Sequence, residues 1–179
     1  MHHDIECVLI SEQQIAEAVA GLGKKISEDY RGKNLMLISV LKGSIVFMAD
    51  LMRHIDNTVA IDFMAVSSYN KGTKTSGIVR ILKDLETSIE GYDILIVEDI
   101  LDSGLTLSYL VEHLSSKGAQ SIKIAALLDK PGRRMVDIVP DYRCFEVPDE
   151  FVVGYGLDYN EHYRNLPYVG VLKPHIFAK

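Results

Sequence analysis

The sequence predicts an α/β protein with a single twisted, mostly parallel β-sheet flanked by helices. Helical and strand-like hydrophobic patterns alternate along its 179 residues, which is typical of this class. Several runs rich in β-branched residues are apolar on both faces, as strands of a parallel sheet are. The chain contains no repeat, low-complexity tract or linker, and its 47% hydrophobic content suits one core. We therefore expect one domain over residues 1–179, with ligands at the carboxyl ends of the strands.

The expected elements follow in order from local signals. Ser11 and Gln14 form a capping-box pattern, and apolar residues then recur at helical spacing until Gly32. Strands are expected at residues 35–41, 59–67, 94–97 and 122–128. Further helices are expected at residues 44–54 and from Leu107 until Lys117 and Gly118.

Composition narrows the function classes. The formal net charge of −6 argues against a broad nucleic-acid-binding surface. Cys7 and Cys144 form neither a disulfide framework nor a CxxC site, and Cys144 lies in an apolar run typical of a core residue. The N-terminus lacks a signal-peptide pattern, and no segment has 18 consecutive apolar residues. We expect a cytoplasmic protein without a membrane or nucleic-acid partner.

The most informative segment is ILIVEDILDSGLT, residues 94–106. Its apolar start predicts a buried strand, after which two carboxylates, Glu98 and Asp99, would repel each other unless solvated or given hydroxyl or cation partners. The small and hydroxylated residues that follow precede a helix whose free N–H groups can bind phosphate. The segment therefore predicts a ligand such as ribose 5-phosphate. The alternative is that Asp102 or Ser103 caps the helix and the carboxylates are a solvated strand end.

These thirteen residues resemble the phosphoribosyl-pyrophosphate signature of the type I phosphoribosyltransferases. Further segments stand in the order expected of the hypoxanthine-guanine branch, namely residues 40–44, 68–69, 128–130 and 145–161. The resemblance runs from about Val8 to Val171. It implies the family fold with a mobile hairpin lid at about 68–80, a purine-binding segment at about 145–166 and a small C-terminal hood. Composition alone favours a solvated turn over a lid for this hairpin.

The resemblance also implies an activity in purine salvage. The substrates would be 5-phosphoribosyl 1-diphosphate and hypoxanthine or guanine, and the products IMP or GMP and pyrophosphate. Mg²⁺ would be the cofactor, with Glu98, Asp99 and Asp158 as metal-site residues. Compact bacterial relatives are usually oligomers, so we expect a homodimer or homotetramer.

Site roles carry over by matching motifs. Ribose and its phosphate would bind Glu98, Asp99, Ile100, Asp102, Ser103, Gly104, Leu105 and Thr106. Pyrophosphate would bind Leu41, Lys42, Gly43, Arg164 and the lid residues Ser68 and Tyr69. The Leu-Lys peptide of this turn can be cis in the family. The purine would stack on Phe151 and form a hydrogen bond with the Val152 backbone. Its 6-oxo group would accept a hydrogen bond from Lys130. Asp102 would act as the general base that takes the proton from N7.

Structural alternatives stay open for these side chains. Lys42 could be a surface lysine, Arg164 a surface ion pair, Phe151 a core residue and Lys130 a solvated loop residue. Two positions depart from the best-known pattern: Leu105 stands where some relatives carry Lys, and Ser44 replaces a second Gly.

Two rival functions also remain. One is a xanthine-preferring transferase, because contacts at purine position 2 come largely from backbone. The other is a nucleic-acid-binding regulator that keeps the fold, which should carry an added DNA-binding domain or a basic face.

Overall fold

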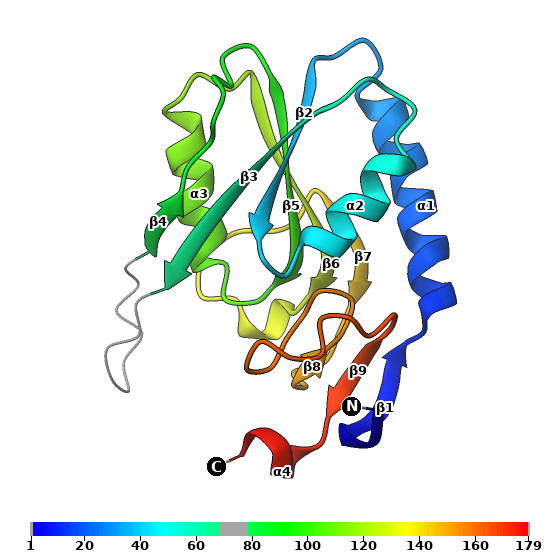
Figure 1. The fold of residues 1–179 in the computed structure, drawn as a ribbon. Coiled ribbons are helices and arrows are strands. Elements are labelled where there is room, and N and C mark those ends of the chain that lie inside the picture. The colour runs from blue at the N-terminus through cyan, green and yellow to red at the C-terminus, as the bar shows by residue number, and fades with distance from the viewer. Residues whose placement is uncertain (1, 69–78, 179) are drawn as a thin grey trace.

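The computed structural model describes residues 2–68 and 79–178 (Figure 1). Its main sheet has the strand order β4-β3-β2-β5-β6-β7. The strands are β2 (Leu35–Leu41), β3 (Ala60–Ser68), β4 (Val79–Lys83), β5 (Asp93–Leu101), β6 (Ser121–Asp129) and β7 (Tyr142–Glu146). All neighbours in this sheet pair in parallel except β4, which is antiparallel to β3 at the edge. The predicted fold class, a mostly parallel sheet flanked by helices, is confirmed.

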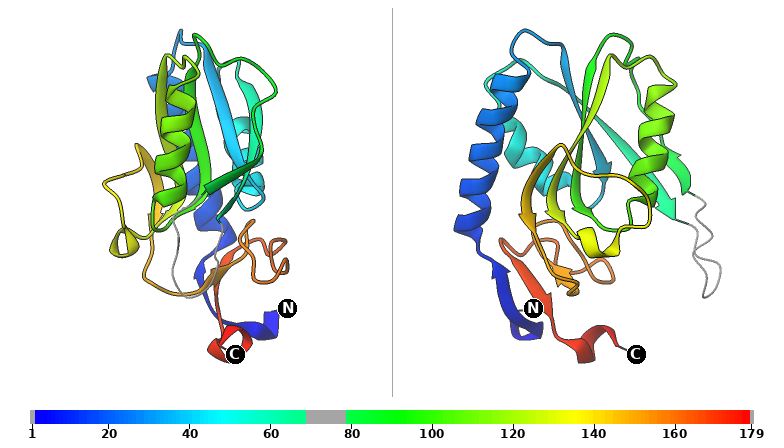
Figure 2. Two further views of the ribbon diagram at one scale, coloured as in Figure 1. Left: turned by 90° about the vertical axis from the view of Figure 1, so that its left-hand side faces the viewer. Right: turned by 180° about the vertical axis from the view of Figure 1, so that it is seen from behind.

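Helices cover both faces of the main sheet. α1 (Glu12–Asp29) and α2 (Ile45–Arg53) pack on one face, and α3 (Leu105–Ser115) packs on the other (Figure 2). The inner strands β2, β5 and β6 are therefore buried on two sides, which explains their continuous apolar runs in the sequence. The predicted capping box is present, because the Ser11 side chain accepts from the Gln14 backbone and Gln14 bonds back to the Ser11 backbone.

A second sheet lies beyond the carboxyl ends of the main strands and brings both chain termini together (Figure 1). It consists of β1 (Ile5–Ile10), β9 (Val169–Leu172) and β8 (Val152–Val153), all antiparallel. Short helical segments complete the chain: η1 (His2–Asp4), η2 (Pro131–Arg133) and α4 (Pro174–Phe177). This sheet, which we call the hood, is not purely C-terminal as expected, because β1 supplies its outer strand.

One strand boundary differs from the sequence prediction in a way that affects the site. β5 continues to Leu101 instead of ending at Val97. The reason is that β6 is also longer and pairs with this extension, through Glu98 with Ala126 and Ile100 with Leu128. The two acidic residues therefore lie inside a paired strand and not beyond its end. Strands β1, β7, β8 and β9 were not predicted, whereas β4 is the second strand-like run of the predicted hairpin.

The cysteines behave as their surroundings suggest. Both are free thiols. Cys144 on β7 packs against the main core, and burial raises the pKa of its thiol to about 12, so the thiolate is scarce near neutrality. The expectation of a core residue is confirmed for Cys144. Within residues 2–68 and 79–178, none of the helices is both long and apolar enough to cross a bilayer.

Candidate active site

Two chain segments meet where the sheet reverses its winding direction. From β2 the chain proceeds to β3 on one side, and from β5 it proceeds to β6 on the other, so adjacent β2 and β5 open a crevice at their carboxyl ends. A Cβ atom added to Gly43 would lie 1.7 Å from Oδ2 of Asp99. The turn after β2 therefore touches the carboxylate of β5 directly, and a larger residue at position 43 would have to displace that carboxylate. The Leu41–Lys42 peptide in this turn is cis.

Two buried hydroxyls hold the turn in place. The Ser44 hydroxyl donates to the Val40 carbonyl at 2.6 Å and lies 2.7 Å from the Ser39 hydroxyl. Both serines are fully buried. Ser44 has an ordinary negative φ of −78°, so this position does not need the backbone freedom of glycine. At position 44 the protein therefore has a serine whose hydrogen bonds hold the turn, in place of a glycine with greater backbone freedom.

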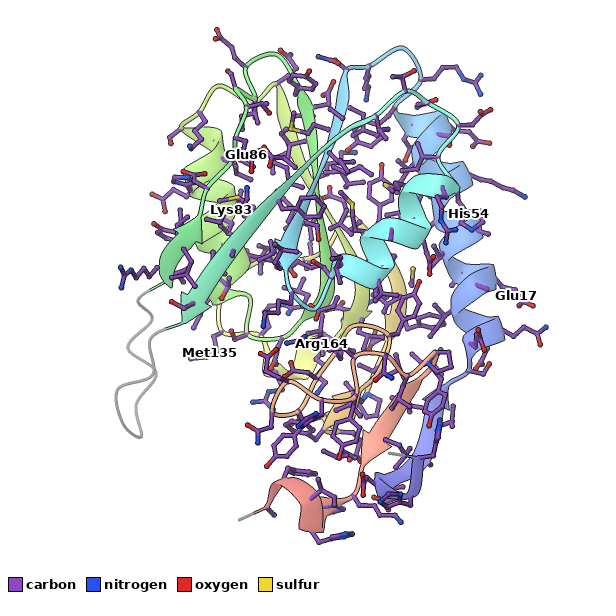
Figure 3. The ribbon with its side chains drawn as sticks, viewed as in Figure 1. Glu17, His54, Lys83, Glu86, Met135 and Arg164 are labelled. Carbon is purple, nitrogen blue, oxygen red and sulfur yellow. The ribbon has the colours of Figure 1, made fainter. Side chains whose placement is uncertain are left out.

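The loop between β8 and β9 closes the crevice from the hood. A Cβ atom on Gly156 would lie 2.0 Å from the Gly43 carbonyl, and Gly156 has φ +101°. The Gly156 backbone exchanges hydrogen bonds with Arg164, donating to its carbonyl at 2.9 Å and accepting from Nη1 at 2.8 Å. This pairing brings Arg164 to the junction of hood and main sheet (Figure 3). Three segments that are remote in sequence therefore converge.

A single carboxylate joins the two cations that we expect to bind pyrophosphate. Lys42 Nζ lies 2.8 Å from Oε2 of Glu161, and Arg164 Nη2 lies 3.5 Å from Oε1. Arg164 also pairs with Asp158 at 3.0 Å. The hydrogen bond from Lys42 lowers the pKa of Glu161. Glu161 thus occupies the position of an anion between the two cations. Sequence reasoning missed this residue, because nothing in its local pattern pairs it with Lys42.

Glu98 is buried and Asp99 is partly buried on β5, and both carboxylates are costly to ionise. Desolvation raises the pKa of Glu98 well above its usual range, and the charge of Asp99 adds to this. Desolvation also raises the pKa of Asp99 to about 6, although the Ile100 N–H and Arg164 oppose the shift. Glu98 is only 8% exposed, so the alternative of a solvated strand end is wrong for it. Cations or hydroxyls of a ligand would relieve this cost.

The loop after β5 leaves the start of α3 free for an anion. The N-cap residue is Gly104, with φ +82° and no side-chain cap. The capping alternative is therefore wrong for Asp102, and for Ser103 it is reduced to one contact with the helix start. Ser103 Oγ makes one long contact of 3.4 Å with the Leu105 N–H. Leu105 is the first helical residue, so a phosphate at the helix start would meet its N–H, and not its side chain, in place of this long Ser103 contact.

A cavity of about 510 Å³ lies between this loop and the hood. It is lined by Ile100, Asp102, Lys130, Arg133, Asp149, Glu150, Phe151, Val152, Leu157 and Phe177. The Lys130 side chain is 7% exposed and donates to the Glu150 carbonyl at 2.6 Å, so it is not a solvated loop residue. Desolvation lowers the pKa of Lys130, opposed by Asp102 and Asp149.

The aromatic wall of the cavity involves one predicted and one unpredicted ring. Phe151 is 38% exposed, so it is not a core residue, and Val152 beside it is buried in β8. Phe151 stacks on Phe177 of α4 with 4.6 Å between ring centroids, and Tyr159 meets it edge-on. Sequence reasoning missed Phe177 because a single aromatic near a chain end carries no pattern.

The predicted lid falls outside the described residues. This applies to Tyr69 and to residues 69–78, and the side chain of Ser68 is likewise not described. Thr106 lies in the first turn of α3, next to residues 102–104 between β5 and α3, which we call the phosphate loop. In the described parts of the chain, no group of three or more His, Cys, Asp and Glu side chains is arranged to hold a metal ion.

The donor set nevertheless fits a metal ion that a diphosphate would carry. Asp158 raises the pKa of Asp99, which places two carboxylates within electrostatic reach of each other. Mg²⁺ prefers oxygen ligands and often relies on few protein carboxylates together with substrate phosphates. Asp99 and Asp158, two of the three residues expected at the metal site, would be the ones to assist such an ion.

With the fold, this arrangement is typical of an α/β enzyme that binds a sugar phosphate at its strand ends. The phosphoribosyl transferase domain model matches residues 9–160, so the chain belongs to the phosphoribosyltransferase family. A hypoxanthine-guanine phosphoribosyltransferase of Bacillus subtilis is 59% identical over 177 residues, covering 99% of this chain and 98% of that relative. One of Streptococcus agalactiae is 55% identical over 179 residues, covering 100% and 99%.

A solved structure agrees with these relatives. The crystal structure of a hypoxanthine phosphoribosyltransferase from Staphylococcus aureus superposes with a TM-score of 0.97 at 51% identity. The match covers 100% of this chain and 97% of that one. The similarity therefore extends over the hood as well as the main sheet.

Proposed function

We propose that the protein transfers the phosphoribosyl group of 5-phosphoribosyl 1-diphosphate to hypoxanthine or guanine, forming IMP or GMP and pyrophosphate in purine salvage. The observation that carries this proposal is the convergence of three segments on one crevice. The β2 turn, the acidic end of β5 and the loop carrying Arg164 surround it, and the cavity beside Phe151 adjoins it. The named activity of the full-length relatives supports the same reaction.

The diphosphate end of the site would stabilise the leaving group. Lys42 and Arg164 provide positive charge on either side of Glu161, which a diphosphate would displace. Mg²⁺ carried by the diphosphate would neutralise further charge, with Asp99 and Asp158 near it. Glu98 and Asp99 would hold the ribose hydroxyls and favour the positive charge that develops on the sugar. The 5-phosphate would bind the N–H groups at the start of α3.

The purine end would select and activate the base. Phe151 offers an aromatic face. The buried Lys130, which donates to the Glu150 carbonyl, would also donate to a 6-oxo group, whereas the amino group of adenine could not accept this hydrogen bond. Asp102 lines the same cavity and would accept the proton from N7 while N9 attacks the sugar carbon.

An assay of nucleotide formation tests the proposal. The protein is incubated with 5-phosphoribosyl 1-diphosphate, Mg²⁺ and one of four bases, and product is followed by absorbance. We expect turnover with hypoxanthine and guanine and none with adenine. Turnover mainly with xanthine would favour the rival transferase, and tight binding of the diphosphate without any turnover would favour a regulator.

Asp102→Asn tests the general base separately. We expect turnover to fall by about 10² or more, the usual contribution of a positioned proton acceptor, while the variant still binds 5-phosphoribosyl 1-diphosphate. Turnover near that of the unmodified enzyme would remove Asp102 from this role. Assembly as a homodimer or homotetramer also stays a proposal, which sedimentation of the purified protein would test.

A further inference from the structure

Arg133 spans the purine cavity between two carboxylates. It lies in η2, three residues after Lys130, and its Nε is 2.9 Å from Oδ1 of Asp102. On the other side, its Nη1 donates to Oδ1 of Asp149 at 3.0 Å. The phosphate loop and the segment before Phe151 are thus linked by one guanidinium. The hydrogen bond to Asp149 and the charge of Asp102 both raise the pKa of Arg133, so the cation persists.

The two oxygens of Asp102 differ in exposure. Oδ1, the atom facing Arg133, is fully buried. The side chain as a whole is nevertheless 43% exposed. The other carboxylate oxygen, Oδ2, is therefore the one open to the cavity. The contact with Arg133 is a close ion pair without aligned hydrogen-bond geometry, so its effect on Asp102 is electrostatic and steric.

The segment that carries Arg133 is itself firmly held. The next residue, Arg134, pairs with the buried Asp129 and donates to the carbonyls of Leu101 and Asp102. The Met135 N–H donates to the Ser103 carbonyl at 2.9 Å. These bonds tie η2 to the backbone of the phosphate loop. Arg133 therefore starts from a fixed base close to Asp102, although half of its side chain is exposed.

We infer that Arg133 is a positioning residue that holds Oδ1 of Asp102 and leaves Oδ2 directed to purine N7. This inference rests on the proposed function, in which Asp102 is the general base. In that step the N7 proton moves to Oδ2, and its electron pair enters the imidazole ring. N9 forms the bond to the sugar carbon, and the C–O bond electrons leave with the diphosphate. A fixed Oδ2 is already oriented for the proton transfer, so less conformational freedom is lost in the transition state.

A double-mutant cycle tests this inference. We measure kcat with hypoxanthine, and KM for 5-phosphoribosyl 1-diphosphate, for Arg133→Met, Asp102→Ala and the double variant. Arg133→Met should lower kcat about tenfold in the unmodified enzyme, a fraction of the usual general-base contribution, and leave the KM for the diphosphate unchanged. In the Asp102→Ala background the same substitution should change kcat less than about twofold, because no carboxylate remains to position.

Two further variants serve as controls. Arg133→Lys keeps the charge without the planar fork and should recover part of the lost kcat. Arg53→Met removes another exposed arginine, which pairs with Asp50 on α2, and should leave kcat unchanged. If Arg133→Met fails to fold, Arg133→Lys carries the cycle in its place.

The outcomes separate the two claims. If Asp102→Ala keeps normal kcat, the proposed general base fails. If Asp102→Ala loses activity but Arg133→Met lowers kcat by the same factor in both backgrounds, the positioning role is overturned while the general base stands. If Asp102→Ala is inactive and Arg133→Met has a normal kcat, the positioning role is likewise overturned and the general base stands.

Discussion

The two ends of the site are built in different ways. At the diphosphate end, which comprises the β2 turn, the acidic end of β5 and the loop carrying Arg164, the closest approaches involve backbone atoms of Gly43 and Gly156. At the purine end, which comprises Lys130, Arg133, the segment 149–152 and Phe177, every contact involves a long side chain: Arg133 pairs with Asp149, Phe151 stacks on Phe177, and Lys130 donates to the Glu150 carbonyl. A site made by backbone depends on glycine at fixed positions. A site made by side chains depends on which loops the fold brings together.

The largest expected effect comes from breaking a backbone approach. Gly43→Ala places a methyl group on the Asp99 carboxylate and should lower kcat/KM by about 10³ or more, since small displacements of reacting groups are costly. The control is Gly21→Ala, where the added Cβ meets nothing within 4 Å and helix stability should rise by about 0.5–1 kcal/mol. Equal activities of the two variants would contradict the comparison.

At the purine end a side-chain change should affect one substrate selectively. Lys130→Met removes the buried donor and should raise KM for hypoxanthine about 10- to 100-fold, because a lost hydrogen bond to a charged group costs about 1.5–3 kcal/mol. KM for the diphosphate should stay nearly constant. Lys24→Met, an exposed lysine of α1, is the control in the same kinetic assay. Equal increases in both KM values would show that the two ends are not separable.

The pH dependence of diphosphate binding should report the ionisation of Asp99. In the free protein desolvation raises the pKa of Asp99 to about 6, above its value in the unfolded chain. Between about pH 4 and pH 6 the folded state therefore binds more protons than the unfolded state. The stability of the fold falls as pH rises through this window. Binding of Mg²⁺-pyrophosphate needs the ionised form. Affinity measured by calorimetry should therefore fall by up to about tenfold per pH unit below pH 6. Asp99→Asn should flatten this slope, and an unchanged slope would assign it to another group.

The smallest expected effect is a gain. Glu161→Gln removes the carboxylate between Lys42 and Arg164 and should lower KM for the diphosphate up to about fivefold, the range of exposed ion pairs. Glu86→Gln is the matched control, because Glu86 contacts Lys83 at 3.1 Å far from the site (Figure 3). A higher KM for Glu161→Gln would mean that Glu161 assists binding instead of competing with it.

Much of the architecture could be predicted from local sequence. Strand β2 begins and ends as predicted, and the Ser11 capping box forms as its pattern indicates. The hood was harder, because β1 and β9 are short and pair across almost the whole chain length. β5 was predicted too short because its acidic residues look like the end of a strand. Only the pairing with β6 shows that the strand continues beyond them.

The sequence by itself determined the parallel sheet, the turn after β2 that contains Gly43, and the start of the phosphate loop. These features follow from the periodicity of hydrophobic residues and from the backbone freedom of glycine, both of which act within a few residues. Only the tertiary structure decided which charges meet. Glu161 joins Lys42 across 119 positions, and Arg133 reaches Asp102 across 31. Such pairs depend on side chains from loops that the sheet and hood bring together, and no local pattern encodes that distance.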